Sequence, residues 1–595
     1  MHTGRLLLLL MGVMSENTRN LSNLLAGWAA AVRDTAHPQP PAYDGPDVAI
    51  TRFTEKTSEV EPGAAFVARV RTGSDGHPWI GRAIDGGASL ILAQRSAAEL
   101  GLVIPPGVGY LLVDDTAEAL AWLSAVWEGF PSRQLVVIGI TGTDGKTTTA
   151  NILFAILRAA GVRAGLLSTI KADIGGAEEL LELHVTTPES PVVQRYLRRM
   201  ADAGLTHCVL ETTSHALAQH RVAAVDFDMA VVTNITHEHL DYHGGYEAYF
   251  SAKRHLFEYL LQDIIHVPTT NRRKVELRRT AVLNRDDGSF APLDEFLAGR
   301  PIDVVRYGLD DRRPTTDDRQ PVLDATASDI EYGPHETSLT IRLPDERPLP
   351  VHAPLPGAFN VYNMLAAAAA ARALGVDGEA IRAGSEGLTY LSGRMERIDR
   401  GQPFLVVVDF AHTPNALDRA IAAARGMIQG KGEGELGSRG AGEPENRDDL
   451  PFPPSPEGRV IAVFGSAGKR DVEKRRLMAD ISARAADLTV LTAEDPRTES
   501  LDDILAMMAG AAAAAGGVEG QTFWRVADRG RAIHFALGLA GPGDVVLICG
   551  KGHEQSMCFG VVEYPWDDRT ATRAALDAWR EGRPMGDLGL PTFGE

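Results

Sequence analysis

The stretch from residue 137 to 157, VIGITGTDGKTTTANILFAIL, constrains the fold more than any other part of the sequence. An apolar run rich in β-branched residues leads into a short turn, and a helical pattern of apolar residues follows it. The turn contains Gly142, Gly145, Lys146 and Thr147. Glycines let backbone N–H groups face an anion, and the start of a helix carries partial positive charge. The stretch therefore predicts a strand–loop–helix unit that binds phosphate.

In a loop of this kind the lysine reaches the β- and γ-phosphates of a nucleotide, and the next hydroxyl binds Mg²⁺. Lys146 and Thr147 stand at these positions. The usual pattern also has a glycine five residues before the second glycine, where this chain has Ile140. An ordinary glycine turn before a helix is therefore the competing interpretation. The loop indicates nucleotide chemistry but does not name a reaction.

Strands and helices alternate along most of the chain, which predicts an α/β fold with mostly parallel sheets. Late apolar runs such as PFLVVVDFAHTP and DVVLICGKG end in Gly, Asp, Pro or His. Because ligands bind beyond the carboxyl ends of parallel strands, we expect binding residues at these tips. We predict three domains: an amino-terminal α/β domain over 45–134, a central parallel-sheet domain over 135–393, and a carboxy-terminal Rossmann-like α/β domain over 394–595.

Three segments are expected to lie outside the folded cores. RLLLLLMGVM is too short to span a bilayer and no cleavage site follows closely. We interpret residues 1–44 as a disordered or wrongly assigned start, with secretion as a minor alternative. Residues 429–458 are rich in Gly, Pro, Glu and Ser, which predicts a flexible insertion. Residues 267–280 are expected to form a smaller surface insertion.

Charge and cysteine content exclude several classes of function. The formal net charge of −20 argues against a nucleic-acid partner, since that needs a basic face. None of the three cysteines forms a CxxC pair, which excludes the usual zinc and disulfide patterns. We expect a cytoplasmic protein with no membrane partner.

Ten short motifs occur along the chain in the order TGTDGKTT, TTPES, ETTSHALAQHRV, HEHLDYHGGYEAYFSAK, GAFNVYN, SGRMERI, DFAHTPNAL, GKRDVEKR, EDPR and GKGHE. Their order and spacing resemble the Mur ligase family, and most closely its branch that adds a diamino acid. The resemblance runs from about residue 55 to 570. Phosphate loops of that family depart from the usual pattern in the same way, which would account for Ile140.

The resemblance implies a monomeric ligase that uses ATP and Mg²⁺ in peptidoglycan precursor synthesis. It would join a free diamino acid to a UDP-N-acetylmuramyl dipeptide through an acyl phosphate. Metal ions and cations are needed because two anions meet when the carboxylate attacks the γ-phosphate. Carbamylation of Lys253 by CO₂, also implied, would turn a cation into a carboxylate-like group beside the metal.

The resemblance assigns roles residue by residue. The catalytic set is Lys146, Glu211, His239 and carbamylated Lys253, and the metal ligands are Thr147, Glu211 and His239. The ATP-binding set is Gly142, Thr143, Asp144, Gly145, Lys146, Thr147, Thr148, Asn284, Asn360, Arg394, Asp409 and His412. The UDP-substrate set is Ser58, Thr186, Thr187, Ser214, Gln219 and Arg221. The amino-acid set is Arg470, Glu494, Asp495, Arg497, Gly550 and Glu554.

Two departures from the family pattern bear on substrates. Where the family has Asp-Ser-Arg, this chain has the segment 57–59, Thr-Ser-Glu. Where diaminopimelate-adding members have Asp-Asn-Pro-Arg, it has Glu-Asp-Pro-Arg. Arg497 suits the second carboxylate of meso-diaminopimelate. Asp495 would repel that carboxylate or pair with Arg497, which favours lysine or ornithine. The choice among the three stays open, and we lean toward a substrate with one carboxylate.

Three other interpretations compete with this one. TTPES, HLDYHG and GKGHE argue against another Mur-family ligase such as folylpolyglutamate synthetase. The intact catalytic set argues against a nucleotide-binding pseudoenzyme. A small-molecule kinase with the same phosphate loop would leave the carboxy-terminal motifs unexplained.

Overall fold

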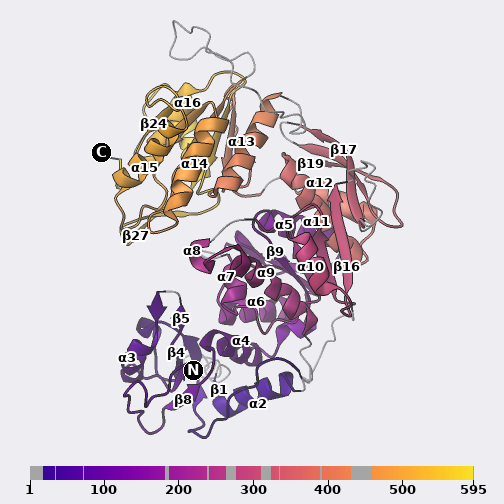
Figure 1. Ribbon diagram of the computed structural model, residues 1–595, viewed down its shortest axis with the longest axis vertical. Coiled ribbons are helices and arrows are strands. Elements are labelled where there is room, and N and C mark those ends of the chain that lie inside the picture. Colours follow the sequence, from indigo (N-terminus) through magenta and orange to yellow (C-terminus); the bar gives the residue numbers. More distant parts are fainter. Residues whose placement is uncertain are drawn as a thin grey trace, which may run out of the picture. The chain divides into compact units, whose positions relative to one another are not determined.

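The computed structural model describes residues 18–33, 35–71, 73–180, 186–236, 240–262, 277–309, 323–333, 336–388, 391–429 and 458–593. Its elements are α/β with parallel sheets, which confirms the predicted fold class (Figure 1). The chain divides into two compact units. The first holds the residues up to 146, 161–283 and 287–305, and the second holds 147–160, 284–286 and the residues from 306 onward. The predicted domain boundaries stay predictions.

The first unit begins with a parallel sheet of four strands in the order β3-β4-β7-β8. These strands are β3 (Arg52–Thr54), β4 (Ala64–Val67), β7 (Leu90–Ala93) and β8 (Gly109–Leu112). The helices here are α2 (Leu21–Ala31), α3 (Ile80–Asp85), α4 (Thr116–Trp127) and the 3₁₀ turns η1 (Thr57–Glu59), η2 (His77–Trp79) and η3 (Pro131–Gln134). Two antiparallel pairs join β1 (Arg19–Asn20) to β2 (Ala49–Ile50) and β5 (Val70–Arg71) to β6 (Ser74–Asp75).

Helix α2 shows that the prediction of a disordered start is wrong from residue 18 onward. Its Leu21, Leu24 and Trp28 are buried at the i, i+3, i+7 spacing of one helix face. The Trp28 ring stacks on Trp122 of α4 at a centroid distance of 6.3 Å. This apolar face orders the segment because it covers α4. Residues 1–17 lie outside the described residues.

The largest sheet has 11 strands in the order β12-β11-β10-β13-β9-β14-β15-β16-β17-β18-β19. Strands β10, β13, β9, β14 and β15 are parallel, and the two ends of the sheet carry antiparallel hairpins. The strands are β9 (Val136–Thr141), β10 (Ala164–Leu167), β11 (Lys171–Asp173), β12 (Glu178–Leu180), β13 (His207–Glu211), β14 (Met229–Val232), β15 (Thr280–Asn284), β16 (Asp303–Leu309), β17 (Ala325–Tyr332), β18 (Thr337–Arg342) and β19 (Leu349–Ala353).

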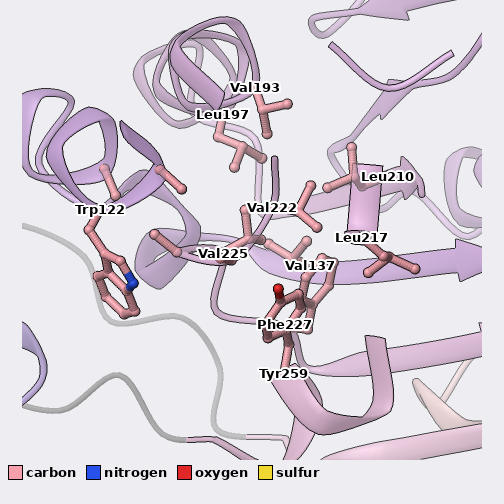
Figure 2. Packing of buried hydrophobic residues seen from close by; sticks show 14 of the residues in the cluster. Trp122, Val137, Val193, Leu197, Leu210, Leu217, Val222, Val225, Phe227 and Tyr259 are labelled. Carbon is pink, nitrogen blue, oxygen red and sulfur yellow. The ribbon is translucent and has the colours of Figure 1, made fainter. Parts of the chain in front are cut away.

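Helices follow the strands of this sheet, as the alternating sequence pattern predicts. They are α5 (Lys146–Ala159), α6 (Ser190–Asp202), α7 (Ser214–Ala218), α8 (Leu240–His243), α9 (Tyr246–Leu261), α10 (Phe290–Leu297), α11 (Ala358–Ala373) and α12 (Gly378–Gly387). Every residue of β9 is buried, because both faces of a parallel sheet are covered. Figure 2 shows Val137 of β9 and Leu210 of β13 in one core with Val193 and Leu197 of α6. This packing fixes the strand tips that carry the site.

The second unit contains a six-stranded sheet in the order β20-β21-β25-β22-β23-β24, parallel except for β20. Its strands are β20 (Glu396–Arg397), β21 (Leu405–Asp409), β22 (Val460–Phe464), β23 (Leu488–Leu491), β24 (Phe523–Arg525) and β25 (Val545–Cys549), and β26 (Ser556–Phe559) pairs with β27 (Val562–Pro565). The helices are α13 (Pro414–Gln429), α14 (Val472–Ala485), α15 (Leu501–Ala514), α16 (Arg529–Leu539) and α17 (Asp568–Arg580).

The two predicted insertions lie almost wholly outside the described residues, which omit 263–276 and 430–457. Gln429 ends α13, and β15 begins at Thr280. Within the described part of the chain, no helix has the length and apolar character needed to cross a membrane.

Candidate active site

The phosphate loop lies between β9 and α5, as its sequence predicts. Gly142 has φ 153° and Gly145 has φ 80°, in the region that favours glycine. A Cβ on Gly142 would lie 1.8 Å from the Thr233 hydroxyl oxygen, so no side chain fits there. Helix α5 begins at Lys146, whose Nζ donates to the Thr143 carbonyl at 2.7 Å. The backbone is therefore shaped as an anion-binding loop with its lysine at the helix start.

The segment after β14, residues 233–236, forms hydrogen bonds to this loop. The sequence did not predict these contacts. The Thr143 N–H donates to the Asn234 carbonyl at 2.7 Å, and the Asp144 N–H donates to Asn234 Oδ1 at 3.1 Å. Thr233 Oγ1 donates to the Asp144 carbonyl at 2.6 Å. The only sequence signal was a pair of polar residues directly after a buried strand. These bonds fix the loop before any ligand binds.

Helix α9 reaches the same loop through two side chains one turn apart. Lys253 is 1% exposed, and its Nζ donates to the Gly142 carbonyl at 2.5 Å. Its ammonium also lies 4.6 Å from the centroid of the Tyr249 ring, a cation–π contact. The Tyr249 and Thr143 hydroxyls lie 3.0 Å apart. Lys253 is thus buried against the phosphate loop, and its carbamylation stays a prediction. Tyr249 was not predicted.

Glu211 ends β13 and pairs in register with Ile140, the residue before the last one of β9. The carboxylate is 1% exposed, and its Oε2 accepts from the Thr169 N–H and hydroxyl, both at 2.9 Å. A carboxylate at a strand tip is an oxygen donor of the kind that Mg²⁺ prefers. His239 lies outside the described residues, and among those described no group of three His, Cys, Asp or Glu could hold a metal.

The predicted substrate residues Thr187, Gln219 and Arg221 form one hydrogen-bonded cluster next to Glu211. Thr187 Oγ1 donates to the Glu211 carbonyl at 2.9 Å, and Arg221 Nη1 donates to the Thr187 carbonyl at 2.6 Å. Arg221 Nη2 donates to Gln219 Oε1 at 2.7 Å and lies 3.0 Å from Glu189 Oε1. Thr186 precedes this cluster half-buried, and the buried Ser214 begins α7. The TTPES and HRV motifs thus meet in space.

The amino-terminal sheet carries an open pocket of about 570 Å³ lined in part by Asp75, His77, Gln94 and Arg95. His77 Nδ1 donates to Asp75 at 2.6 Å, and its Nε2 accepts from the Gln94 N–H at 3.1 Å. Hydrogen bonds from the His77 backbone and ring, together with Arg95, lower the pKa of Asp75 to about 2. These contacts keep the carboxylate ionised and the imidazole fixed in one orientation.

Ser58 was predicted to contact the UDP substrate, and it lies exposed in the 3₁₀ turn η1. Glu59, which stands where the family has the arginine of Asp-Ser-Arg, pairs with Lys56 at 2.9 Å and with Arg52 at 3.4 Å. The acid is thus part of a local ion-pair group on the surface of this sheet.

Two predicted adenine-side residues lie in the second unit and are held by local hydrogen bonds. Asn284 Oδ1 accepts from the Asp286 N–H at 3.1 Å. Asn360 Nδ2 donates to the Pro356 carbonyl at 2.7 Å, and its Oδ1 accepts from Asn363 at 3.1 Å. Asn363 in turn accepts from Thr149 of α5 at 3.3 Å. This chain of bonds ties α11 to the helix that carries the buried Thr147 and Thr148.

Arg394, Asp409 and His412 meet at the tip of β21. Asp409 accepts from the Met395 N–H at 2.8 Å and from the Ala411 N–H at 2.7 Å. It therefore holds the backbone directly after Arg394 and directly before His412. Arg394 Nη2 lies 3.5 Å from Thr147 Oγ1, at the limit of a hydrogen bond. The arginine predicted to reach phosphate therefore lies beside the hydroxyl predicted to bind the metal.

The predicted amino-acid residues come from three loops at the tips of β22, β23 and β25. Gly550 has φ 113°, and a Cβ there would lie 2.6 Å from Glu494 Oε2, so the carboxyl packs against the glycine. Oε2 is buried with no hydrogen-bond partner. Burial raises the pKa of Glu494 to about 7. A buried carboxyl with a free acceptor suits a substrate ammonium group.

Asp495 does not have Arg497, one of its predicted partners, as its ion-pair partner. Its Oδ1 accepts from Lys551 Nζ at 3.0 Å and from the Cys558 N–H at 2.9 Å. Lys551, which is 2% exposed, also lies 2.6 Å from Glu554 Oε2. Burial lowers the pKa of Lys551, but Glu554 and Asp495 outweigh it and raise that pKa. Lys551 therefore offsets the negative charge of Asp495 within the protein.

The two remaining arginines are on the same loops. Within the described residues, no carboxylate lies within ion-pair distance of Arg470 or Arg497, and Arg470 is exposed. Glu499 holds the Arg470 loop by accepting from the Lys469 N–H at 2.9 Å while pairing with Arg475 at 2.6 Å. Two cations thus stay available beside three acidic side chains, and sequence reasoning missed Lys551, Arg475 and Glu499.

Two family models match the sequence. The Mur ligase middle domain matches residues 140–371, and the Mur ligase glutamate ligase domain matches residues 452–552. The first match covers the phosphate loop, Glu211, Lys253 and Asn360. The second covers every predicted amino-acid residue except Glu554, which lies just beyond its end.

Whole-chain comparisons agree with these matches. The chain is 38% identical to a UDP-N-acetylmuramyl-tripeptide synthetase of Roseiflexus sp. (strain RS-1), over 87% of this chain and 92% of that protein. It is 35% identical to a UDP-N-acetylmuramoyl-L-alanyl-D-glutamate–2,6-diaminopimelate ligase of Bacillus licheniformis, over 90% and 96%. A solved structure of a ligase of the latter name is 26% identical with a TM-score of 0.54, covering 89% of this chain and 95% of its own.

Proposed function

The chain belongs to the Mur ligase family, and we propose that it is an ATP-dependent ligase that adds a diamino acid to UDP-N-acetylmuramoyl-L-alanyl-D-glutamate. The observation that carries the proposal is the strand-tip arrangement: Glu211 lies in register with Ile140 at the entrance of the phosphate loop, with Lys253 buried against that loop. The proposal includes Mg²⁺ as the metal, a monomeric enzyme and a cytoplasmic location.

The residues divide the chemistry between them. Lys146 and the backbone N–H groups of the phosphate loop hold the β- and γ-phosphates. Thr147 and Glu211 would hold Mg²⁺, which offsets phosphate charge when bound. Arg394 adds a cation beside Thr147, so the substrate carboxylate meets a γ-phosphate whose charge is offset. The carboxylate bonds to the γ-phosphorus and ADP leaves, which gives the acyl phosphate. The amine of the diamino acid then attacks the acyl carbon and loses a proton, and phosphate leaves.

The amino-acid site supports meso-diaminopimelate as the added residue. The lean toward a substrate with one carboxylate assumed that Asp495 repels a carboxylate or pairs with Arg497. In the structure Asp495 is bonded to Lys551 and to the Cys558 N–H instead. Arg497 then keeps its charge for a distal carboxylate, and Glu494 or Glu554 can receive the distal ammonium.

Product formation tests this proposal. The enzyme is incubated with ATP, Mg²⁺ and the UDP-muramyl dipeptide, with meso-diaminopimelate, L-lysine or L-ornithine in separate reactions, and the products are weighed by mass spectrometry. The proposal predicts a tripeptide product with meso-diaminopimelate at a kcat/KM well above the other two. A preference for lysine or ornithine would refute the amino-acid assignment, and no product with any of the three would refute the ligase.

A further inference from the structure

The loop that carries the amino-acid residues is in direct backbone contact with the segment that carries Arg394. Gly393 has φ 62°, and a Cβ on it would lie 2.2 Å from the Gly552 carbonyl carbon and from the His553 nitrogen. Gly552 has φ 52°, and a Cβ on it would lie 2.8 Å from the Gly393 oxygen and from Phe410 Cα. No side chain fits between these backbone segments, so they pack in direct contact.

The same contact continues through side chains. The Phe410 ring contacts both the Arg394 guanidinium, whose Cζ is 4.5 Å from the ring centroid, and the His553 ring, whose centroid is 4.7 Å away. Arg394 on the ring face is a cation–π arrangement, which restricts a long side chain to one orientation. That orientation brings Nη2 to 3.5 Å from Thr147 Oγ1.

His553 is suited to this place because it is neutral. Burial, followed by the nearby Arg394, Arg569 and Lys551, lowers the pKa of His553 to about 3. An uncharged imidazole can pack on Phe410 without repelling the Arg394 guanidinium that contacts the same ring. Among the residues that the structure describes, His553 forms no ion pair, and its ring contacts Phe410 at the neighbouring tip of β21.

The opposite end of the loop holds the amino-acid groups. Lys551 and Glu554 flank the segment 552–553 and pair with each other at 2.6 Å, and Lys551 continues to Asp495 at 3.0 Å. A ligand ammonium or carboxylate that bonds to Glu554 or shifts the Lys551 pairs therefore acts on the loop 550–555, which also contacts Phe410 and Gly393.

We propose that Phe410 and His553 are positioning residues that hold Arg394 toward the nucleotide and couple nucleotide binding to amino-acid binding. The identity of the amino acid rests on the proposed function. Phe410 sets the direction of Arg394, and His553 connects that ring to the amino-acid loop. Thermodynamic linkage requires the coupling to be mutual: the amino acid tightens the nucleotide by the same factor as the nucleotide tightens the amino acid.

Calorimetric titration of a non-hydrolysable ATP analogue into the full chain tests this, with Mg²⁺ and the UDP-muramyl dipeptide present and with or without saturating meso-diaminopimelate. In the wild type we expect the amino acid to tighten the analogue about 5-fold or more. Phe410→Leu should weaken the analogue about 5-fold without amino acid, from loss of the cation–π contact, and should bring the coupling factor to about one. Phe410→Tyr should restore both.

His553→Leu separates the two parts of the proposal. It should leave analogue affinity without amino acid within about 2-fold of wild type while abolishing the coupling, since Phe410 and Arg394 still touch. Phe535→Leu is the matched control, because Phe535 is also half-buried and packs its ring on Trp524 at the β24 edge of the same sheet. It should change neither quantity.

Three results would overturn the inference: no coupling in the wild type, wild-type affinity and coupling in Phe410→Leu, or equal losses in Phe535→Leu. Failure of the proposed function gives a different result, namely no product in the mass-spectrometric assay. The analogue titration without amino acid still reports on Phe410 and Arg394 in that case.

Discussion

Replacing Lys551 by methionine removes the buried cation that joins Asp495 to Glu554. The methionine keeps most of the apolar stem volume, so the change is mainly one of charge. Lys551 is 2% exposed, and the Asp495 side chain is 19% exposed. Removing one partner of a buried ion pair costs about 3–5 kcal/mol. The Glu554 side chain is 41% exposed, so water screens its share, and we expect the low end, about 3 kcal/mol.

The dependence on pH gives the charge interpretation a second test. Burial already raises the pKa of Glu554 against the opposing effect of Lys551, and loss of Lys551 raises it further. A carboxyl with a raised folded-state pKa loses stability as pH rises from its unfolded value, 4.5, through its folded value. The deficit of the variant should therefore be largest near pH 8 and smaller near pH 5.

Urea unfolding of wild type and Lys551→Met at pH 5 and pH 8 measures both quantities, with Lys469→Met as control. Lys469 is an exposed lysine in the loop between β22 and α14, so its replacement should shift the midpoint little. A deficit below about 1 kcal/mol at pH 8, or one that is equal at pH 5, would refute the reasoning that the buried Lys551 offsets the charges of Asp495 and Glu554.

Three further predictions concern single residues. Lys146→Ala should raise the barrier to ligation by about 3 kcal/mol or more without lowering the melting temperature, and wild-type kcat in this variant would refute the phosphate-loop role. Lys253→Ala should be nearly inactive and be partly restored by short carboxylic acids, while full activity without them would contradict the carbamate hypothesis. Because burial raises the pKa of Glu494 to about 7, the wild-type KM for the diamino acid should fall as pH rises from about 6 to 8, as the carboxyl ionises and binds ammonium. Glu494→Gln should lose that pH dependence of KM. It should also lose the wild type's decline in stability as pH rises from 4.5 toward 7. An unchanged pH dependence of KM in the variant would exclude Glu494 as the group that binds the substrate ammonium.

The sequence predicted those parts of the fold and site that depend on local patterns. A strand, a glycine turn and a lysine at a helix start together indicate a phosphate loop. All three lie within a short stretch of sequence, so a local pattern is enough to predict them. Alternation of apolar runs and helices predicted parallel sheets, and the strand tips carry most of the proposed residues. The hydrogen bonds of Thr233 and Asn234 to the phosphate loop could not be predicted, since two polar residues after a strand have many uses.

Long-range pairing was the other gap. Asp495 was expected to face either a substrate or Arg497, its neighbour in sequence, but it bonds to Lys551, 56 residues away. No local pattern reports such a partner, because parallel strand tips bring together loops that are distant in sequence. The error at α2 had a different cause. The apolar run at the start of the chain led us to treat all of residues 1–44 as one segment, although α2 has an amphipathic face that packs on Trp122.

The central claim is that the substrate carboxylate is phosphorylated before the amine attacks. A UDP-muramyl dipeptide labelled with ¹⁸O in the reacting carboxylate of its D-glutamyl residue tests this claim directly, by mass analysis of the phosphate released during ligation of meso-diaminopimelate. The account predicts one ¹⁸O atom in each released phosphate, since the acyl phosphate keeps a carboxylate oxygen on phosphorus when its C–O bond breaks. Phosphate that carries only oxygen from ATP and water would contradict it.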